Sequence, residues 1–413
     1  MRFVKSAAIW ILSASTASAQ APAAHVRYEI PLLPGFEQSF VTAISEVGHA
    51  VGYATSHTGE VHPFIWTAEG GTVDLGTRGG RRSFAYDVND LGEVVGYNEL
   101  PDGGSRAFLW TTARGMVDLG TLGGRYSAAF AINDSGQIAG TAQTASPIAD
   151  HAVIWTRSGG VIDLGAPGGR SSAALGINEV GEVTGTIELG PDAENEFSSK
   201  VFVWTPGVGF QLTSATGLGN DINERQQVTG GPVEGFLWSA KDGLKKLGTF
   251  GARSEGFAVN NRREVVGWSA FTDGGIAQAF LWTASGGLMP LASAPSSAQG
   301  INDSGWVVTS NALSNPIIWQ LDVTPGDLVA ALRARVSAFE RVGVLGSRDS
   351  DDLAKRLDQA ERRLDGRSTA AFAAALRTFA KRLDRLVREG TLTAPQAVPL
   401  HHLTTVALDL AQR

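Results

Sequence analysis

The chain repeats a pattern of short alternating hydrophobic and polar runs that are separated by turn residues. Residues 127–165 contain four such runs, at 128–132, 137–142, 151–156 and 161–164. The breaks between them carry Asn-Asp-Ser-Gly, a polar stretch and Ser-Gly-Gly. Asn bonds its own downstream backbone and Gly accepts positive φ, so these breaks predict tight turns between antiparallel strands. The pattern within one unit therefore predicts four antiparallel strands.

Two signatures of this unit recur seven times and alternate strictly along the chain. The first is a turn of the form Ile/Val-Asn/Ser, which begins at Ile44, Val88, Ile132, Ile177, Ile222, Val259 and Ile301. The second is a hydrophobic run that ends in Trp, at Trp66, Trp110, Trp155, Trp204, Trp238, Trp282 and Trp319. The turns are 37 to 45 residues apart. Four antiparallel strands in a unit of this length are typical of a β-propeller blade.

The ends of the repeat region predict how the ring closes. Residues 26–33 resemble the fourth run of a unit, and the last unit, which contains Trp319, lacks a fourth run. Pairing the two would complete the last blade and cover an exposed sheet edge. We therefore predict a mainly β protein, with a seven-bladed β-propeller over residues 20–322 that is closed by the N-terminal strand. An open β-solenoid and an eight-fold ring made with a partner are the alternatives.

From Thr324 onward the pattern becomes helical. Leu and Ala recur at spacings of three and four residues, and glycine nearly vanishes. Thr324 followed by Pro325 has the form of a helix N-cap with Pro at the first helical position. Further starts near Asp349, Ser368 and Thr393 bring the number of predicted amphipathic helices to four. We expect residues 323–413 to form a small antiparallel helical bundle.

Residues 1–19 have the form of a secretory signal peptide. Arg2 and Lys5 give a basic start, residues 7–12 form a short apolar core, and Ala-Ser-Ala at 17–19 is a small-residue cleavage site. The apolar run is far shorter than the ~20 residues that a membrane-spanning helix needs. We predict cleavage near Ala19 and a protein that is secreted, periplasmic or on the cell surface, with no membrane span. An uncleaved N-terminal anchor is the alternative.

The charge of the chain excludes some classes of partner. The chain has 34 basic and 41 acidic residues, a net charge of −7, whereas nucleic-acid binding requires a basic surface. Residues 20–322 hold 17 basic and 30 acidic residues, while residues 323–413 hold 15 and 11. There is no Cys, so disulfides, thiolate nucleophiles and thiolate metal sites are excluded.

The repeat resembles a known family of bacterial extracellular repeats. Its form at Phe108-Leu109-Trp110, in the run 117–124, and at Ala131-Ile132-Asn133-Asp134-Ser135-Gly136 is similar to the HAF repeat. The likeness covers residues 26–320 and implies a secreted protein with β-propeller-like repeats, without implying catalytic residues. Units five and six depart from the repeat because they lack the turn Gly. The helical tail resembles the C-terminal FIMAH modules of many secreted bacterial enzymes, which implies an accessory role.

A search for catalytic chemistry yields no site. The histidines show no metal-binding spacing such as His-Glu-x-x-His, so we predict no metal, no cofactor and no catalytic residue. His57 and His62 share one loop and could meet, but solvated histidines are the simpler interpretation. A serine stands six residues before the turn position in six units, at Ser39, Ser83, Ser127, Ser172, Ser254 and Ser296. Six copies of one hydroxyl predict a structural role, since one active site needs a single nucleophile.

Four arginines occupy equivalent or nearly equivalent positions about eight residues before the turn. They are Arg81, Arg125, Arg170 and Arg253. In a closed ring, equivalent positions converge around one axis, so these cations are expected at one mouth. One interpretation is a mouth that binds carboxylate or phosphate groups through bidentate contacts. The alternative is local pairing with a neighbouring carboxylate or carbonyl group, for example at Asp74, Asp118 or Asp163.

The longest loops join the second and third strands of each unit, on the same side as these arginines. Length variation on one side of a repeat scaffold usually marks its binding side. The insertion at 188–200 is acidic, and Asp192, Glu194 and Glu196 are therefore candidate ligand-binding residues. A solvated excursion is the alternative interpretation of this loop.

These observations favour a non-enzymatic binding or scaffold protein. Its loop face would contact an extracellular glycan, a peptide or a component of the cell envelope. The alternative is an extracellular polysaccharide hydrolase or lyase that uses loop carboxylates such as Glu99 or Asp102. Glycosidases need two carboxyl groups about 5–10 Å apart, so a carboxylate pair in the mouth would favour the enzyme.

Overall fold

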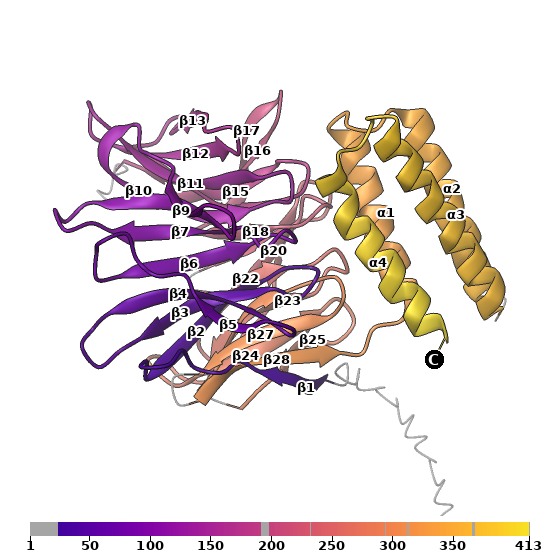
Figure 1. Ribbon diagram of the computed structural model, residues 1–413, viewed down its shortest axis with the longest axis horizontal. Coiled ribbons are helices and arrows are strands. Elements are labelled where there is room, and N and C mark those ends of the chain that lie inside the picture. The colour runs from indigo at the N-terminus through magenta and orange to yellow at the C-terminus, as the bar shows by residue number, and fades with distance from the viewer. Residues whose placement is uncertain are drawn as a thin grey trace, which may run out of the picture.

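The computed structural model describes residues 24–190, 198–231, 233–293, 295–311, 314–365 and 368–412. Strands form seven sheets of four, and four helices follow them (Figure 1). The seven-bladed propeller predicted from the repeat is therefore confirmed. The signal-peptide segment 1–19 lies outside the described residues, as do Asp192, Glu194 and Glu196.

The strands of each blade follow one another along the chain, from the innermost strand outward. Blade 1 contains β2 (Gln38–Ile44), β3 (Ala50–Thr55), β4 (Val61–Thr67) and β5 (Gly71–Asp74). Blade 2 contains β6 (Ser83–Val88), β7 (Val94–Glu99), β8 (Ser105–Thr111) and β9 (Gly115–Asp118). Blade 3 contains β10 (Gly123–Ile132), β11 (Gln137–Thr144), β12 (Asp150–Thr156) and β13 (Val161–Gly165). Blade 4 contains β14 (Ser171–Ile177), β15 (Val183–Leu189), β16 (Ser198–Thr205) and β17 (Gly209–Thr216).

The remaining blades keep this order. Blade 5 contains β18 (Gly219–Ile222), β19 (Val228–Gly230), β20 (Phe236–Ser239) and β21 (Gly243–Lys246). Blade 6 contains β22 (Ser254–Val259), β23 (Val265–Ala270), β24 (Ala277–Thr283) and β25 (Gly287–Pro290). Blade 7 contains β26 (Ser297–Ile301), β27 (Trp306–Asn311), β28 (Ser314–Leu321) and β1 (Ala24–Glu29).

The N-terminal strand closes the ring as predicted. β1 pairs antiparallel with β28, with Val26 opposite Trp319 and Tyr28 opposite Ile318. The prediction placed this strand over residues 26–33, whereas β1 ends at Glu29. Since β1 supplies the outer strand of blade 7, the edge of β28 is covered.

Each innermost strand carries a β-bulge at the same place. The pairing shifts, for example, between Val41 and Ala43 in β2 and between Ala85 and Asp87 in β6. In blades 1 to 6 a glycine of the second strand lies opposite the bulge, where a Cβ would come within 1.8–2.2 Å of a carbonyl oxygen of the innermost strand. These glycines are therefore required by the close approach of the two backbones.

Two blades build the first turn without its glycine. In the other five blades the fourth turn residue is Gly with positive φ, for example Gly92 at 72°. Gln226 and Arg263 take this position in blades 5 and 6 with φ of 55° and 67°. The turn geometry is thus preserved, although side chains seldom adopt this backbone conformation.

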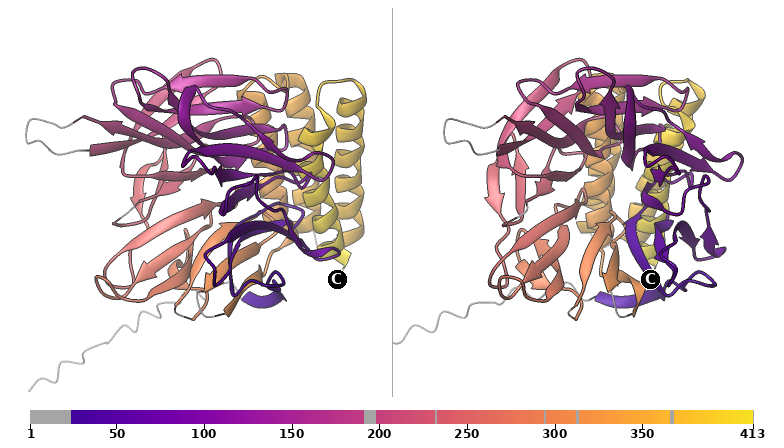
Figure 2. Two further views of the ribbon diagram at one scale, coloured as in Figure 1. Left: turned by 60° about the vertical axis from the view of Figure 1, so that its left-hand side comes forward. Right: turned by 90° about the vertical axis from the view of Figure 1, so that its left-hand side faces the viewer.

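The C-terminal residues form four helices beside one end of the propeller. They are α1 (Pro325–Arg341), α2 (Ser347–Asp365), α3 (Thr369–Arg388) and α4 (Ala394–Gln412). A capping box of Thr324 and Asp327 begins α1. α1 and α4 lie next to the propeller, and α2 and α3 lie on the side of the bundle that faces away from it (Figure 1). Looking from the opposite end, the blades surround the axis with the helices behind them (Figure 2).

Candidate functional site

The innermost strands of all seven blades line a central channel. It contains a cavity of about 240 Å³. One side chain from an equivalent position of each blade lines it: Thr42, Tyr86, Phe130, Leu175, Asn220, Phe257 and Gln299. We call the end that faces the helices the helix-side mouth and the other end the distal mouth. The first turn of each blade lies at the helix-side mouth.

The seven first turns bond to one another around the helix-side mouth. The turn Asn of each of six blades donates its side-chain N–H to the carbonyl at the same position of the next blade, at 2.9–3.2 Å. Asn302 of blade 7 reaches the carbonyl of Ser45 in blade 1. Blade 1 carries Ser45 in place of Asn and so contributes no amide. The turn residues therefore hold neighbouring blades together.

The next residue of each turn forms a second ring, made of side-chain oxygens. Each oxygen accepts a backbone N–H from the preceding blade, at 2.7–3.1 Å. The ring consists of Glu46, Asp90, Asp134, Glu179, Glu224, Asn261 and Asp303. We call it the acidic ring, because six of its seven members carry carboxyl groups.

Arg335 of α1 inserts into the acidic ring. Its side chain is only 6% exposed, and Nη2 lies 3.0 Å from Glu46 Oε1 and 3.5 Å from Asp303 Oδ2. At the side of the ring, Arg341 donates two hydrogen bonds to the fully buried Glu182. Val180 of the propeller packs into the hydrophobic core of the helices. The helical bundle thus covers the helix-side mouth and places a buried cation on the channel axis.

The acidic ring holds more carboxyl groups than Arg335 can neutralise. Burial raises the pKa of Glu46 to about 8, with repulsion from Asp303 adding to it and Arg335 opposing it. Burial likewise raises the pKa of Asp134 and of Glu224 to about 7. Burial alone would lower the pKa of Arg335, but the surrounding carboxylates raise it well above its usual value. Arg335 is therefore a permanent cation among partly protonated acids.

A continuous series of aromatic side chains follows one side of the channel toward its distal end. Ring centroids 5.0–5.9 Å apart connect a series of rings that runs from blade 1 to blade 3. We call this series the aromatic arc; its members are Phe40, Tyr53, Phe84, Tyr97, Tyr86 and Phe130. All six side chains are half-buried. Tyr86 and Phe130 of the arc line the cavity of the channel, and the other rings pack behind them in geometries that aromatic pairs favour.

Blades 5 to 7 place several polar groups at the equivalent positions, beside Phe257 and Trp268 of blade 6. Glu255 accepts hydrogen bonds from Asn220 Nδ2 at 3.0 Å and from Trp268 Nε1 at 3.3 Å. Burial raises the pKa of Glu255, and these two hydrogen bonds oppose the rise. Gln299 and Ser297 continue the polar side and bond to each other. The distal half of the channel therefore has a continuous aromatic series on one side and hydrogen-bonding groups, with two further rings, on the other.

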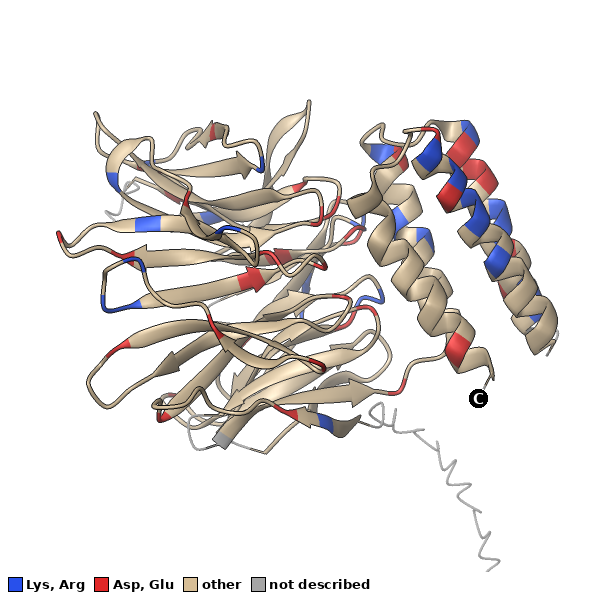
Figure 3. Cartoon of the chain, in the orientation of Figure 1, with Lys and Arg blue, Asp and Glu red and all other residues tan. Residues whose placement is uncertain are grey.

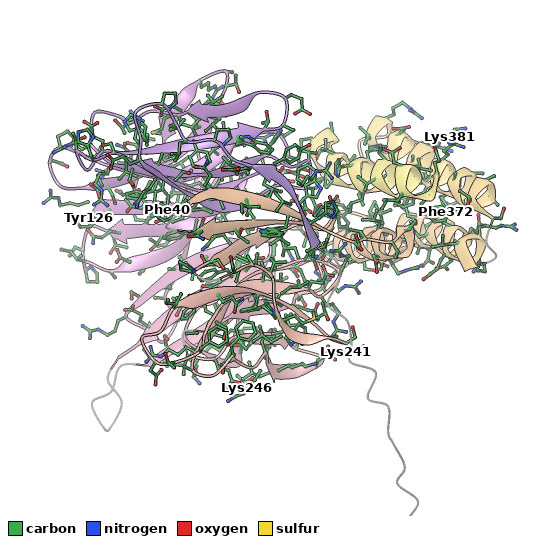
Figure 4. The ribbon with its side chains drawn as sticks, turned by 90° about the horizontal axis from the view of Figure 1, so that it is seen from below. Phe40, Tyr126, Lys241, Lys246, Phe372 and Lys381 are labelled. Atoms are coloured by element: carbon green, nitrogen blue, oxygen red, sulfur yellow. The ribbon has the colours of Figure 1, made fainter. Side chains whose placement is uncertain are left out.

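The loops around the distal mouth add exposed apolar side chains. Six large hydrophobic residues of these loops and strand starts are 38–76% exposed: Tyr126, Ile148, Leu218, Val233, Phe271 and Ile276. Tyr126 lies at the end of the propeller far from the helices (Figure 4). Exposed apolar groups collected on one face are typical of a contact surface.

The four predicted arginines lie just before an inner strand or, for Arg125, near the start of β10, and all are exposed at this distal end. Arg81 donates to the carbonyl of Thr58, and Arg125 donates to that of Asp102, both at 2.6 Å. Arg253 pairs with the exposed Asp273 at 3.3 Å, and Arg170 also has a partner. In two of these blades the guanidinium therefore fastens a loop of the preceding blade.

The carboxylates suggested as their partners bind other groups. His62 Nδ1 lies 2.9 Å from Asp74, and His151 Nδ1 lies 2.9 Å from Asp163. Asp118 accepts the backbone N–H of Gly120. These three aspartates are therefore not the partners of the arginines, whereas the bonds of Arg81 and Arg125 to carbonyl oxygens agree with the alternative of local pairing.

The other candidates from the sequence have structural contacts. Glu99 pairs with Arg82 at 3.6 Å, and the Asp102 side chain accepts the N–H of Gly104. The hydroxyls of Ser127, Ser172, Ser254 and Ser296 accept a backbone N–H from the preceding blade, which confirms their structural role. Among the residues that the structure describes, no group of three His, Asp or Glu side chains is arranged to hold a metal ion.

Sequence reasoning missed both the acidic ring with Arg335 and the aromatic arc. The Asn-Asp pair was recognised only as a turn signal. The aromatic residues of the arc are spread over separate positions of blades 1 to 3, where they alternate with other residues along each strand. Comparing equivalent positions of the seven units would have found both. The positions of the acidic ring are acidic in six units, whereas the position of Phe40 is occupied by Phe, Ala, Leu, Glu or Ser.

One family model matches the helical part of the chain. A model of the FIMAH domain matches residues 329–408. No curated protein sequence matches the chain. None of the helices described in the structure is long and apolar enough to cross a membrane.

Solved structures similar to this chain include a β-propeller domain and two further proteins. The β-propeller domain of the Trilobed protease from Pyrococcus furiosus has a TM-score of 0.46 and 10% identity, over 68% of this chain and 93% of that one. A putative gluconolactonase has a TM-score of 0.42 and 7% identity, over 73% and 93%. AofleA from Arthrobotrys oligospora has a TM-score of 0.39 and 11% identity, over 73% and 94%. At these values the likenesses carry no argument about activity or ligand.

Proposed function

We propose that this protein is a secreted, HAF-type binding propeller that recognises an extracellular glycan at its distal mouth. The proposal rests on one observation: the distal channel has an aromatic side, the aromatic arc, and a polar side that includes Asn220, Glu255 and Gln299. Sugar rings stack their apolar faces on aromatic side chains and direct hydroxyl groups to hydrogen-bonding groups at their edges. The two sides of the channel offer both kinds of contact to one ligand.

The position of the helical bundle supports this choice of mouth. The bundle covers the helix-side mouth through Arg335 and Arg341, so a ligand there would compete with a buried ion pair. At the distal mouth the exposed residues Tyr126, Phe271 and Ile276 extend the surface around the channel. The N-terminal segment 1–19 supports secretion, because it has the sequence form of a signal peptide.

The predicted arginines take a secondary place in this proposal. Arg81 and Arg125 are already bonded to loop carbonyls, so they shape the rim of the distal mouth. Their remaining N–H groups face solvent in part, since both residues are exposed. We propose that they, with Arg170 and Arg253, contact acidic substituents of the ligand. The acidic loop containing Asp192, Glu194 and Glu196 stays a prediction.

The test is a glycan array probed with residues 20–413. Wild-type protein is compared with Tyr53→Ala/Tyr97→Ala, which removes the middle of the aromatic arc. We expect the variant to lose tenfold or more in affinity for every glycan retained, about 1.4 kcal/mol or more. Tyr28→Ala is the control for loss of a tyrosine ring, since Tyr28 of β1, the outermost strand of blade 7, contacts Trp66 and Trp306 and is not a member of the arc.

Two outcomes would contradict the proposal. Equal glycan binding by the arc variant and the control would show that the aromatic arc takes no part in recognition. Turnover of a bound polysaccharide would favour the hydrolase or lyase alternative over a binding protein. Retained binding by Arg81→Ala/Arg125→Ala/Arg170→Ala would exclude only the proposed contribution of the rim arginines.

A further inference from the structure

The outer face of the helical bundle carries a groove between α2 and α3. One end of it has a volume of about 850 Å³. Small side chains of α3, among them Ala371, Ala374 and Ala375, line one wall, while Arg362 and Arg363 of α2 line the other. Because α1 and α4 lie next to the propeller, this groove faces away from it (Figure 1).

Basic groups at this end of the bundle have no acidic partner. Arg362, Arg363, Arg377 and Lys381 are exposed, and none lies within 4.0 Å of a carboxylate among the described residues. Lys381 projects from the bundle in Figure 4. We call this end, with its four basic residues, the cationic groove.

The other end of the same groove carries acidic as well as basic residues. Arg382 pairs with Asp349 and Asp352, and Arg385 pairs with Glu389 at 2.7 Å. Arg356 also pairs with Asp352, whereas the exposed Arg348 and Lys355 of this end have no ion pair among the described residues. Figure 3 shows this mixture of acidic and basic residues on the helices far from the propeller. The cationic groove differs in that none of its basic residues is held in an ion pair, although the chain as a whole is acidic.

The surroundings of the cationic groove indicate which kind of polyanion fits. Binding to a lipid surface needs exposed apolar anchors beside the basic groups, and none of the exposed large hydrophobic residues of the described chain belongs to the helices. Single-stranded nucleic acid needs aromatic groups for stacking, and Phe339, Phe372 and Phe379 are fully buried. Recognition here can use only charge and hydrogen bonds, which suits a hydrophilic polymer of carboxylates.

We propose that the cationic groove binds an acidic polysaccharide, with its carboxylate groups contacting Arg362 and Arg363. The planar guanidinium fork binds carboxylates with two parallel hydrogen bonds. The small side chains of Ala371, Ala374 and Ala375 leave room for a chain of sugar rings along α3. This site lies on the far side of the bundle from the distal mouth, so the helical module would hold the protein on a charged polymer while the propeller binds its own ligand.

The test measures binding of the full mature chain to polygalacturonate by biolayer interferometry at 50 mM NaCl. We expect Arg362→Gln/Arg363→Gln to weaken binding at least tenfold. The control, Arg114→Gln/Lys241→Gln, removes the same charge from exposed turns of the propeller and should stay within twofold of wild type. Raising NaCl to 0.5 M should abolish wild-type binding, because screening shortens the range of the charges to a few ångströms.

Each other outcome overturns the proposal. Equal binding by the two double variants would show that the groove takes no part. Absence of wild-type binding to polygalacturonate, or binding only to phosphatidylserine vesicles or single-stranded DNA, would exclude an acidic polysaccharide. Tyr53→Ala/Tyr97→Ala should bind polygalacturonate like wild type, so failure here and failure of the glycan proposal at the distal mouth are distinguishable.

Discussion

The two mouths of the channel are built from the same seven repeats, yet only one of them keeps the seven-fold pattern. At the helix-side mouth six of seven blades carry the turn Asn, and six of seven positions of the acidic ring are carboxylates. At the distal mouth the position of Phe40 holds Phe, Ala, Leu, Glu or Ser from blade to blade. The difference follows from what each side chain bonds to.

A side chain that bonds to the backbone of the neighbouring blade must recur in every blade if every link is to form. The turn Asn and the acidic ring are of this kind, so one change interrupts a closed chain of contacts. Side chains at the distal mouth point into the channel and bond to few equivalent residues, so they can differ. In this propeller, positions that carry the same type of residue in nearly every blade hold the blades together. Positions whose residue type differs from blade to blade form the candidate binding site.

Removing Arg335 should have the largest effect on this comparison. Arg335→Met leaves the carboxylates of Glu46 and Asp303 buried without their cation, which costs about 3–5 kcal/mol. Hydrogen exchange of α1 and a thermal melt of the full chain measure the loss. Arg333→Met, on the same helix, removes only partly exposed ion pairs with Asp358 and Glu361 and should cost less than about 1 kcal/mol. Similar costs for both would contradict the role of Arg335.

The acidic ring should also make the docked bundle less stable at alkaline pH. Folding raises the pKa of Glu46 to about 8 and those of Asp134 and Glu224 to about 7. Their stabilising contribution is full below their ordinary values near 4 and is lost as pH rises through 7 to 8. We expect Tm to fall between pH 6 and 9. A Tm that stays flat or rises over this range would contradict a destabilising effect of the acidic ring at alkaline pH.

Breaking one link of the turn ring should be the next largest change. Asn178→Ser removes the amide that donates to Asn223 O and to Glu182, and leaves buried acceptors unpaired. We expect a loss of about 1–3 kcal/mol in the free energy of unfolding. The reverse change, Ser45→Asn, supplies the missing seventh amide and should stabilise the ring by about 1 kcal/mol. Urea unfolding of both variants decides whether the links act as described.

The smallest expected effect concerns the strained turn of blade 6. Arg263 has a φ of 67° at a position where five blades carry Gly. Arg263→Gly should stabilise the protein by up to about 1 kcal/mol, because glycine adopts this conformation without steric cost. Gly92→Ala is the reverse control, because the added Cβ would have its nearest neighbours at 3.7 Å. We expect the free energy of unfolding to fall by about 1 kcal/mol, and this loss would report backbone strain alone.

Much of the fold could be predicted from the repeat. The number of blades followed from counting Ile/Val-Asn/Ser turns and Trp runs, and the closing strand followed from a surplus run at residues 26–33 and a missing one after Trp319. The helices were predicted to begin near Pro325, Asp349, Ser368 and Thr393, and they begin at Pro325, Ser347, Thr369 and Ala394. The candidate site was predicted less well. Arg81 and Arg125 lie at the expected mouth, but their bonds to loop carbonyls depend on loop conformations that no spacing reveals.

The sequence by itself determined the architecture, because period, turn residues and alternation are local properties that repeat along the chain. Only the tertiary structure decided which mouth is covered, since Arg335 meets Glu46 from a position 289 residues away. It likewise decided that residues from three blades form one aromatic arc and that Glu255 faces it across the channel. Contacts of this kind depend on closure of the ring and on docking of the bundle, where distance along the chain no longer predicts distance in space.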